Sequence, residues 1–448
     1  MPPHLPRQGG GAAHLRPRPD HARRKAHRVT PLTRLLISSQ FAFNVGFFAV
    51  LPYLADHLGG ALGLGGALVG LVLGLRTFSQ QGLFVVGGAL TDRYGPRPLV
   101  LVGCALRIAG FVWLALAASA WTVIGAVVLV GFAAALFSPA VESEIAREAL
   151  RVERSGGPRR TRTLARFSAG GQAGALLGPV IGALLLHGAG DAHFRTACLA
   201  GAGVFAVVLA AHARLLPRGG GRERSPGEWR AVLGERRFLR LALAYSTYLL
   251  AYNQLYLALP AELDRATGSQ AALGWLFALS SALVVFGSGP LERLASARLD
   301  SPAMVRAGLF LTAAAFAATA ALGSYGGLWA AVTFTVLLTL GQMLVLPATR
   351  ALLPDLVDER HLGLATGALS SLAGLVVLAA AAPVGALLDH RGPTPWLLLA
   401  ATPLLGLTLV PAGPGTAKAG PRAGTTTAVP ASEQRGLWRR ASGGGSRG

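Results

Sequence analysis

Ionisable side chains that could bind a proton or a small polar group lie inside or beside long apolar stretches of the sequence. Arg76 and Arg107 fall near the middle of two such stretches. An arginine at bilayer depth costs about 2.5–3.5 kcal/mol on insertion scales, so each of them should face protein or water. The candidate carboxylates are Asp92, Glu142 and Glu144, which lie nearest the predicted cytoplasmic ends of these stretches. None of them is central in an apolar stretch. Because burial favours the protonated form of a carboxylate, these three are the candidate proton-coupling residues.

A tyrosine stripe occupies the apolar stretch 238–260. At 100° per residue, Tyr245, Tyr248 and Tyr252 share one helix face, and Asn253 lies beside them. Such a stripe is consistent with simple packing. Tyrosine hydroxyls need hydrogen-bond partners in a membrane, however, which favours a water-filled cavity. Both interpretations remain open from the sequence.

The elements that must position these residues are membrane-spanning helices. The chain has 448 residues, of which 52% are hydrophobic and 14% charged, whereas soluble domains carry about 25% charged residues. A span needs about 20 apolar residues. Hydropathy predicts an all-α integral membrane protein with twelve transmembrane helices, at residues 33–55, 66–90, 98–119, 121–143, 165–187, 194–216, 238–260, 271–290, 303–323, 327–349, 363–388 and 393–412.

The formal charge of +21 has two explanations, nucleic-acid binding and membrane orientation. Most of the 41 Lys and Arg residues fall in segments that lie on one side of the membrane if the N-terminus is cytoplasmic. This positive-inside asymmetry predicts a multi-pass protein of the cell (plasma or inner) membrane with both termini in the cytoplasm. We therefore expect the lipid bilayer, and no nucleic acid, as a partner.

The two halves of the chain repeat. The Pro-Ala pair at Pro139 recurs at Pro347, 208 residues later, and the Pro-Val pair at Pro179 recurs at Pro383, 204 residues later. Repeated halves with a binding site between them are a known transporter architecture. The predicted domains are a basic disordered cytoplasmic tail (1–32), a six-helix bundle (33–216), a cytoplasmic central loop (217–237), a second six-helix bundle (238–412) and a disordered basic cytoplasmic tail (413–448).

A short polar link joins the second and third predicted spans. Its residues Gly88, Leu90, Asp92, Arg93, Gly95, Arg97 and Val100 match the pattern G-x-L-x-D-R-x-G-x-R-x-x-V, while Pro96 departs from it. The pattern resembles the loop signature of the major facilitator superfamily (MFS) of secondary transporters, a twelve-helix fold in two six-helix pseudo-repeats. The resemblance implies that these residues gate the transport cycle.

The chemistry of this motif agrees with such a role. Gly88 permits close helix packing and Gly95 permits a turn with positive φ. Arg93 and Arg97 can meet acids or helix C-termini in one conformation only, and such a pairing biases the conformational equilibrium. Alternatively, the two arginines only follow the positive-inside rule.

The fifth predicted span carries a second motif, made of Gly174, Gly178, Pro179 and Gly182. It resembles the G-x-x-x-G-P-x-x-G-G signature of drug:proton antiporters in the same superfamily, except that Ala183 replaces the last glycine. The glycines share one helix face, which allows a neighbour to approach closely, and the proline bends the helix. We expect a kinked helix at the interface of the two halves; ordinary small-residue packing is the alternative.

Spans 1–5 are also similar to the MdtH-like group of multidrug efflux transporters, through the residues around Arg76 and Arg107. Arg107 could instead snorkel toward the inner surface. In the superfamily, helices 1, 4, 7 and 10 line the central cavity. Together with the polar pair Arg76 and Gln80, this predicts a substrate cavity lined by Gln40, Asn44, Arg76, Gln80, Phe137, Tyr245, Tyr248, Tyr252, Asn253 and Gln342.

These patterns predict a secondary active transporter. The expected activity is proton-driven efflux of small hydrophobic or amphiphilic compounds by alternating access, with a small molecule and protons as partners of a monomer. The alternatives are a proton-coupled metabolite importer or exporter, and a non-transporting membrane sensor or scaffold. No metal-ligand cluster, phosphate-binding loop or catalytic constellation occurs in the sequence, so we expect no metal, no cofactor and no enzymatic activity.

Overall fold

A computed structural model of the chain describes residues 30–155, 157–185, 191–217, 232–323, 327–358, 361–390 and 392–412. The chain divides into two compact units, Met1–Pro411 and Ala412–Gly448, and Ala412 is the part of the second unit that is described. Nearly all of both predicted tails and most of the predicted central loop therefore lie outside the described residues.

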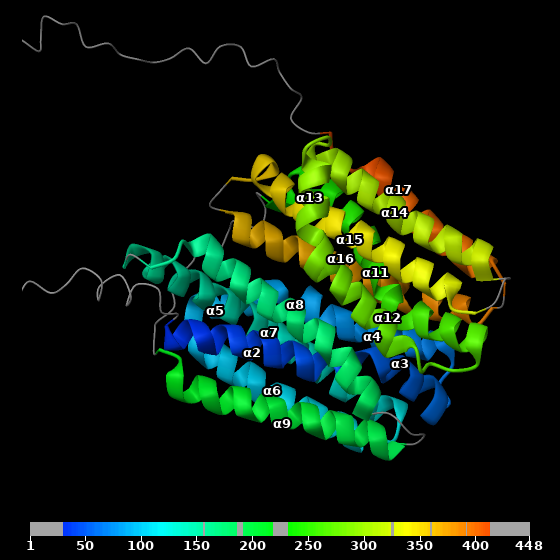
Figure 1. Ribbon diagram of the computed structural model, residues 1–448, viewed down its shortest axis with the longest axis horizontal. Helices are drawn as coiled ribbons and strands as arrows, with labels where there is room; N and C mark the ends of the chain where they lie inside the picture. Colours follow the sequence, from blue (N-terminus) through cyan, green and yellow to red (C-terminus); the bar gives the residue numbers. More distant parts are fainter. Residues whose placement is uncertain are drawn as a thin grey trace, which may run out of the picture. The chain divides into compact units, whose positions relative to one another are not determined.

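The first half of the chain forms six spans, two of them built from more than one helical segment (Figure 1). The segments are α2 (Pro31–Phe48), η1 (Leu51–Tyr53), α3 (Leu54–Asp56) and η2 (His57–Ala61) in span 1, α4 (Gly66–Thr77), η3 (Phe78–Gly82) and α5 (Phe84–Tyr94) in span 2, then α6 (Pro96–Leu116), α7 (Ala120–Arg154), α8 (Arg160–Leu185) and α9 (Asp191–Leu215).

The second half forms the other six spans. Its segments are α11 (Arg236–Thr267), then α12 (Leu273–Ala282), η4 (Leu283–Gly287) and α13 (Ser288–Ser296) in one span, followed by α14 (Ser301–Leu322), α15 (Trp329–Leu356), α16 (Leu362–Leu388) and α17 (Thr394–Leu409). The described residues contain helices, turns and no strand.

Ten helical stretches of the described chain are long and apolar enough to cross a membrane. The other two spans are α17, which is shorter at 16 residues, and α11, whose apolar run is interrupted by the tyrosine stripe, Asn253 and Gln254. The twelve spans confirm the predicted all-α fold.

The fourth predicted span, 121–143, was too short. Helix α7 continues to Arg154, and its extension is held by Arg151, which pairs with Glu144 at 2.9 Å and with Glu148 at 2.7 Å. The pair of Glu148 and Arg151 has the i,i+3 spacing that stabilises an exposed helix end, and Glu144 lies one turn further back on the same face. Hydropathy does not detect such pairs.

Local sequence explains several helix ends. Thr30 caps α2 by accepting a hydrogen bond from the Thr33 amide, with Pro31 as the first helical residue. Ser119 and Thr122 form a reciprocal capping box at the start of α7. The turn between α5 and α6 is made by Gly95 with φ of +82°, which confirms the predicted turn with positive φ.

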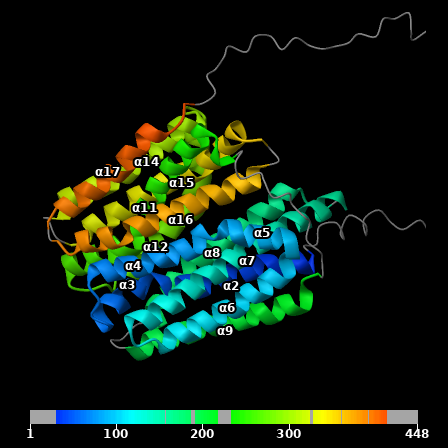
Figure 2. The same cartoon turned by 180° about the vertical axis from the view of Figure 1, so that it is seen from behind.

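The two halves of the chain also share an irregularity in their helices, at equivalent positions. One π-helical turn, η3, interrupts span 2, and another, η4, interrupts span 8 at a position 205 residues later, from Phe78 to Leu283. The packing is also repeated: α6 packs on α7 and α9 in the first half, as α14 packs on α15 and α17 in the second. Seen from behind, α16 of the second half runs alongside α4 of the first (Figure 2).

Candidate functional site

A cavity of about 1460 Å³ lies between the two halves. Its wall is supplied by η3, α5 and α7 on one side and by α11, α15 and α16 on the other. The cavity reaches the end of the bundle at which the α5–α6 turn lies, where Arg93 and Arg350 are exposed. We call this end the mouth.

The tyrosine stripe on α11 forms a continuous row of rings. The ring centroids are 5.6 Å apart from Tyr245 to Tyr248, 6.0 Å from Tyr248 to Tyr252 and 6.3 Å from Tyr252 to Tyr256. The first three rings line the cavity, while Tyr256 packs behind them on Phe277. The row therefore offers a solute both aromatic surface and phenolic hydroxyls.

Gln342 on α15 faces this row. Its side chain is hydrogen-bonded to Tyr252, and its carbonyl oxygen has no partner among the residues that the structure describes. An unsatisfied buried acceptor costs free energy unless water or a ligand pairs with it. Gln342 can thus accept a hydrogen bond from a molecule in the cavity.

Charged groups cluster near the mouth. Asp92 and Arg93 come from α5, Glu142 comes from α7, and Arg350 comes from α15. Arg350 lies within electrostatic range of Glu142 and of Tyr245. The cavity thus combines an aromatic and amide interior with a mouth that carries charges of both signs.

At the opposite end, α4 and α16 close the gap between the halves. A Cβ at Gly66 would overlap the carboxylate of Asp389, and one at Gly70 would overlap the backbone of Ala381. The contact includes a hydrogen bond of 3.2 Å from the Gly66 amide to Asp389. Because small residues at four-residue spacing let two helix backbones meet, α4 and α16 leave no passage between them here.

Helices α8 and α12 close the second seam at this end. Pro179 lacks the N–H that would bond the Ala175 carbonyl, and Ser281 of α12 donates to that carbonyl at 3.1 Å. Tyr53 donates to the Pro179 carbonyl at 2.6 Å. A Cβ at Gly274 of α12 would come within 2.6 Å of the Tyr53 hydroxyl. The cavity is therefore open at the mouth and sealed at the other end.

The predicted gating motif is divided between the cavity and the surrounding helices. Gly88, Asp92 and Arg93 line the cavity, whereas Leu90 packs against the hydrophobic core. Arg97 donates a hydrogen bond of 2.8 Å to the Ala213 carbonyl near the end of α9, so it meets a helix C-terminus within its own half.

The close contact expected at Gly88 is absent from this conformation. A Cβ at Gly88 would meet no atom within 4 Å, because the residue faces the cavity. Its neighbour Gly87 is the residue at the close approach, since a Cβ there would overlap the Ala135 carbonyl. That carbonyl lies one turn before Pro139, which cannot donate to it.

The glycines of the α8 motif face α2, in the same half of the chain. Cβ atoms at Gly174, Gly178 and Gly182 would collide with α2 or with the residues directly after it. The contact with the other half is made by another part of α8, at Ala175 and Pro179. The motif therefore acts in two places. Its glycine face packs inside one half, whereas the Ala175 carbonyl, which Pro179 leaves without a helical donor, lies at the interface between the halves.

Six of the ten predicted cavity residues lie away from the cavity wall. Asn44 donates to the Gly171 carbonyl of α8 at 3.0 Å, and Gln40 lies beside it. Phe137 is fully buried and stacks on Phe43 at a centroid distance of 4.3 Å. Asn253 accepts a hydrogen bond of 2.9 Å from Thr77, which links α11 to α4. The other two, Gln80 and Arg76, are hydrogen-bonded to each other.

Arg76 and Arg107 lie in the interior of the first half, next to aromatic rings. Arg76 donates to Gln80 at 2.7 Å and stands 4.7 Å from the ring centroid of Phe47. Arg107 is 0% exposed, donates to the Val130 carbonyl at 2.7 Å and lies 4.3 Å from the ring of Phe43. Arg107 therefore does not snorkel, and cation–π contacts replace hydration around both charges.

Several functional candidates were not identified from the sequence. Gln81 and Arg350 on the cavity wall, and Ser281 between the halves, carry no local motif. The glycines Gly66, Gly70 and Gly74 did carry a signal, because they recur every four residues. Within the described residues no group of three His, Cys, Asp or Glu side chains could hold a metal ion.

Two six-helix repeats around a central cavity define a class, the helical secondary transporters. The family model described as "Major Facilitator Superfamily" matches residues 36–261 and 241–442. The chain belongs to this superfamily and is a multi-pass membrane transporter rather than an enzyme.

Relatives and solved structures agree with this assignment. An uncharacterized MFS-type transporter of Mycobacterium tuberculosis is 36% identical over 372 residues, which cover 80% of this chain and 86% of the relative. The multidrug resistance protein MdtH of Yersinia pestis is 33% identical over 324 residues, covering 71% and 77%.

Two crystal structures show the same fold at low identity. A POT family transporter in complex with 5-aminolevulinic acid has a TM-score of 0.72 at 12% identity, covering 84% of this chain and 95% of that chain. The nucleoside transporter NupG has a TM-score of 0.69 at 12% identity, covering 85% and 98%.

Proposed function

We propose that the protein exports small hydrophobic or amphiphilic compounds in exchange for protons. The observation that carries this proposal is the 1460 Å³ cavity, which is lined by the tyrosine row and Gln342 and is sealed at one end. Its volume exceeds the roughly 300–1,000 Å³ of most ligand pockets, which suits substrates of varied size. Aromatic rings bind apolar bodies, and hydroxyl and amide groups pair with scattered polar atoms.

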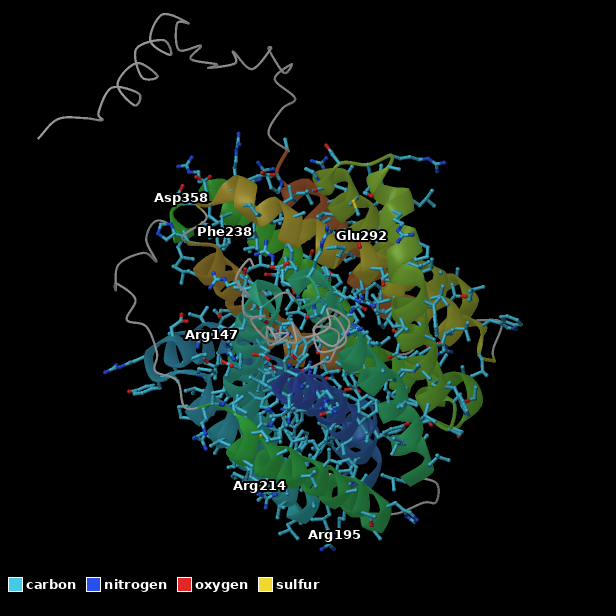
Figure 3. All side chains as sticks on the ribbon, turned by 60° about the vertical axis from the view of Figure 1, so that its left-hand side comes forward. Arg147, Arg195, Arg214, Phe238, Glu292 and Asp358 are labelled. Carbon is cyan, nitrogen blue, oxygen red and sulfur yellow. The ribbon has the colours of Figure 1, made fainter. Side chains whose placement is uncertain are left out.

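The orientation of the protein follows from its charges. Arg147, near the end of α7, and Arg214, at the end of α9, mark the same end of the bundle as the mouth, whereas Arg195 lies at the other end of α9 (Figure 3). The positive-inside rule places the basic end in the cytoplasm. The conformation described above would then be inward-facing, and both termini would be cytoplasmic.

Transport would proceed by rocking of 33–216 against 238–412. Opening the sealed end requires separation of α4 from α16 and of α8 from α12, while closing the mouth brings α5 toward α16. Gly88 has no neighbour in the inward-facing state and is free to pack closely when the mouth closes. This supports the gating role of the α5–α6 motif.

Proton coupling needs a carboxylate that both the cavity water and the substrate can reach. Asp92 and Glu142 line the cavity and meet this condition. Glu144 is 4% exposed and is held by Arg151 at 2.9 Å, which disfavours it. The similarity to MdtH supports a drug-like substrate class and the outward direction of transport.

The second candidate is a proton-coupled transporter of a polar metabolite, either an importer or an exporter. The charges at the mouth favour it, because Arg93 and Arg350 with Asp92 and Glu142 could hold a charged solute. A sensor or scaffold role is favoured less, since such a protein has no need of a large cavity that is sealed at one end.

The test uses inverted membrane vesicles that contain the full-length protein. An inside-acid pH gradient is imposed, and accumulation of cationic, neutral and anionic fluorescent dyes is followed with and without a protonophore. We expect accumulation above that of vesicles lacking the protein, abolished by the protonophore. Absence of accumulation for every dye, together with gradient-dependent movement of a polar metabolite, would replace the first candidate with the second.

A further inference from the structure

Glu142 and Arg350 occupy equivalent positions in the two repeats. Arg350 follows Glu142 by 208 residues, the same interval that separates Pro139 from Pro347. Each charged residue therefore lies three positions after the proline inside the same span of its half, on α7 and on α15. A two-fold repeat places equivalent residues opposite each other across the central axis.

The structure agrees with this placement. Both side chains line the cavity, both are exposed, and they interact electrostatically across it. The ion pairs found within the described residues join Arg151 to Glu144 and Glu148, and Arg265 to Glu262. Glu142 and Arg350 thus face each other without being locked in an ion pair while the mouth is open.

Few other groups compete for Glu142. Among the described residues, the titratable or charged side chains that line the cavity with it are Asp92 and Arg93 of α5, Tyr245, Tyr248 and Tyr252 of α11, and Arg350 of α15. On its own helix, Glu144 and Glu148 are buried and paired with Arg151. Of the two cations that the described residues place on the wall, Arg350 is the one that belongs to the opposite half.

We propose that Glu142 binds the transported proton and that Arg350 takes the place of this proton when the mouth closes. The proposal rests on the proposed function, proton-driven export, and names its coupling site. In the inward-facing state the O–H bond of the Glu142 carboxylic acid breaks and the proton passes to water in the cavity. The carboxylate that remains attracts the guanidinium of Arg350, and the ion pair draws α7 and α15 together.

The return half of the cycle reverses this step. In the outward-facing state a proton from the other side of the membrane binds the Glu142 carboxylate, and the carboxylic acid no longer holds Arg350. The mouth then reopens to the cytoplasm. Because a ligand shifts a conformational equilibrium only through its differential affinity for the two states, the proton drives transport by favouring the open mouth.

The experiment compares two modes of transport by variants in inverted vesicles. One mode is dye accumulation driven by an inside-acid gradient, and the other is exchange of labelled for unlabelled dye without a gradient. Glu142→Gln should lose gradient-driven accumulation to the level of empty vesicles. It should retain exchange at a reduced rate, because the neutral amide neither carries a proton nor forms the ion pair that helps to close the mouth. The matched control is Glu292→Gln, which alters an exposed carboxylate in the middle of α13 that is not on the cavity wall. This variant should keep both modes.

The pairing is tested by charge exchange. The double variant Glu142→Arg/Arg350→Glu should recover transport relative to Glu142→Arg alone, at equal amounts of protein in the membrane. Gradient-driven accumulation by Glu142→Gln at the wild-type rate, or a double variant no better than the single, would overturn the inference. Absence of both modes in the wild-type protein would instead refute the proposed function.

Discussion

The hydroxyl of Ser281 donates a hydrogen bond of 3.1 Å to the carbonyl of Ala175, across the interface between the two halves. That carbonyl is available because Pro179, four residues later, has no N–H to offer it. The proline of the α8 motif therefore has an effect beyond its own helix. It creates an acceptor that the other half of the molecule satisfies on the sealed side of the cavity.

Replacement of Ser281 by alanine should weaken this seam. The lost hydrogen bond contributes about 0.5–1.5 kcal/mol, and the Ala175 carbonyl would then lack a partner. In a Pro179→Ala background the helix can supply its own N–H, so Ser281→Ala should cost less there. Thermal unfolding of the purified protein in a double-mutant cycle measures the difference. Equal costs in both backgrounds would show that Pro179 and Ser281 act independently.

Gly87 and Gly88 should respond oppositely to alanine. At Gly87 a Cβ would overlap the Ala135 carbonyl, so Gly87→Ala should destabilise the protein by about 1–3 kcal/mol. At Gly88 the Cβ enters the cavity, and alanine is the better residue inside a helix, so Gly88→Ala should leave the unfolding temperature unchanged or raise it. The variant should reduce the transport rate, because the mouth closes less well. Unfolding and transport are measured on both variants. Unimpaired transport by Gly88→Ala would remove the gating role of this glycine.

The contact between α4 and α16 should set how easily the sealed end opens. Gly70→Ala would push a methyl group into the backbone of Ala381, which should favour the state in which the two helices separate. Labelling of a cysteine placed at the sealed end, by a membrane-impermeant reagent, should rise. The control is Gly203→Ala on α9, where a Cβ meets nothing within 4 Å. If both variants label at the wild-type rate, this contact does not limit opening.

The two buried arginines should differ in importance. Arg76 bonds Gln80 and stands 5.8 Å from the ring centroid of Tyr256, so it links the first half to α11 of the second. The contacts of Arg107, with Val130, Phe43 and other phenylalanines, stay within the first half. Arg76→Ala should therefore reduce transport per folded molecule more than Arg107→Ala, and the reverse ranking would contradict this assignment.

Much of the fold could be predicted from the sequence because bilayer thickness fixes the length of an apolar span. The twelve spans, the repeat and the positive φ of Gly95 all follow from local patterns. The extension of α7 does not, because the pairs of Arg151 with Glu144 and Glu148 depend on side-chain geometry at a polar helix end.

The site was harder to predict, for a physical reason. A membrane helix that is apolar all round does not reveal which face it turns toward a cavity. Phe137 illustrates this: its helix does line the cavity, but its ring stacks on Phe43 on another face. The tyrosine row was more informative, because its hydroxyls require polar surroundings. The roles of Arg350 and Ser281 depend on partners in the other half of the chain. No single stretch of sequence shows that these residues meet.

The central claim is that one cavity between the two halves opens at one end at a time. Its most direct test is a pair of spin-label distances in the full-length protein in lipid nanodiscs at acid and alkaline pH, with the buried Cys104 and Cys198 replaced by serine. One pair, at Ala89 and Thr366, spans the mouth, and the other, at Gly65 and His390, spans the sealed end. We predict that alkaline pH shortens the first distance and lengthens the second. Two distances that stay constant, or that change in the same direction, would contradict alternating access through this cavity.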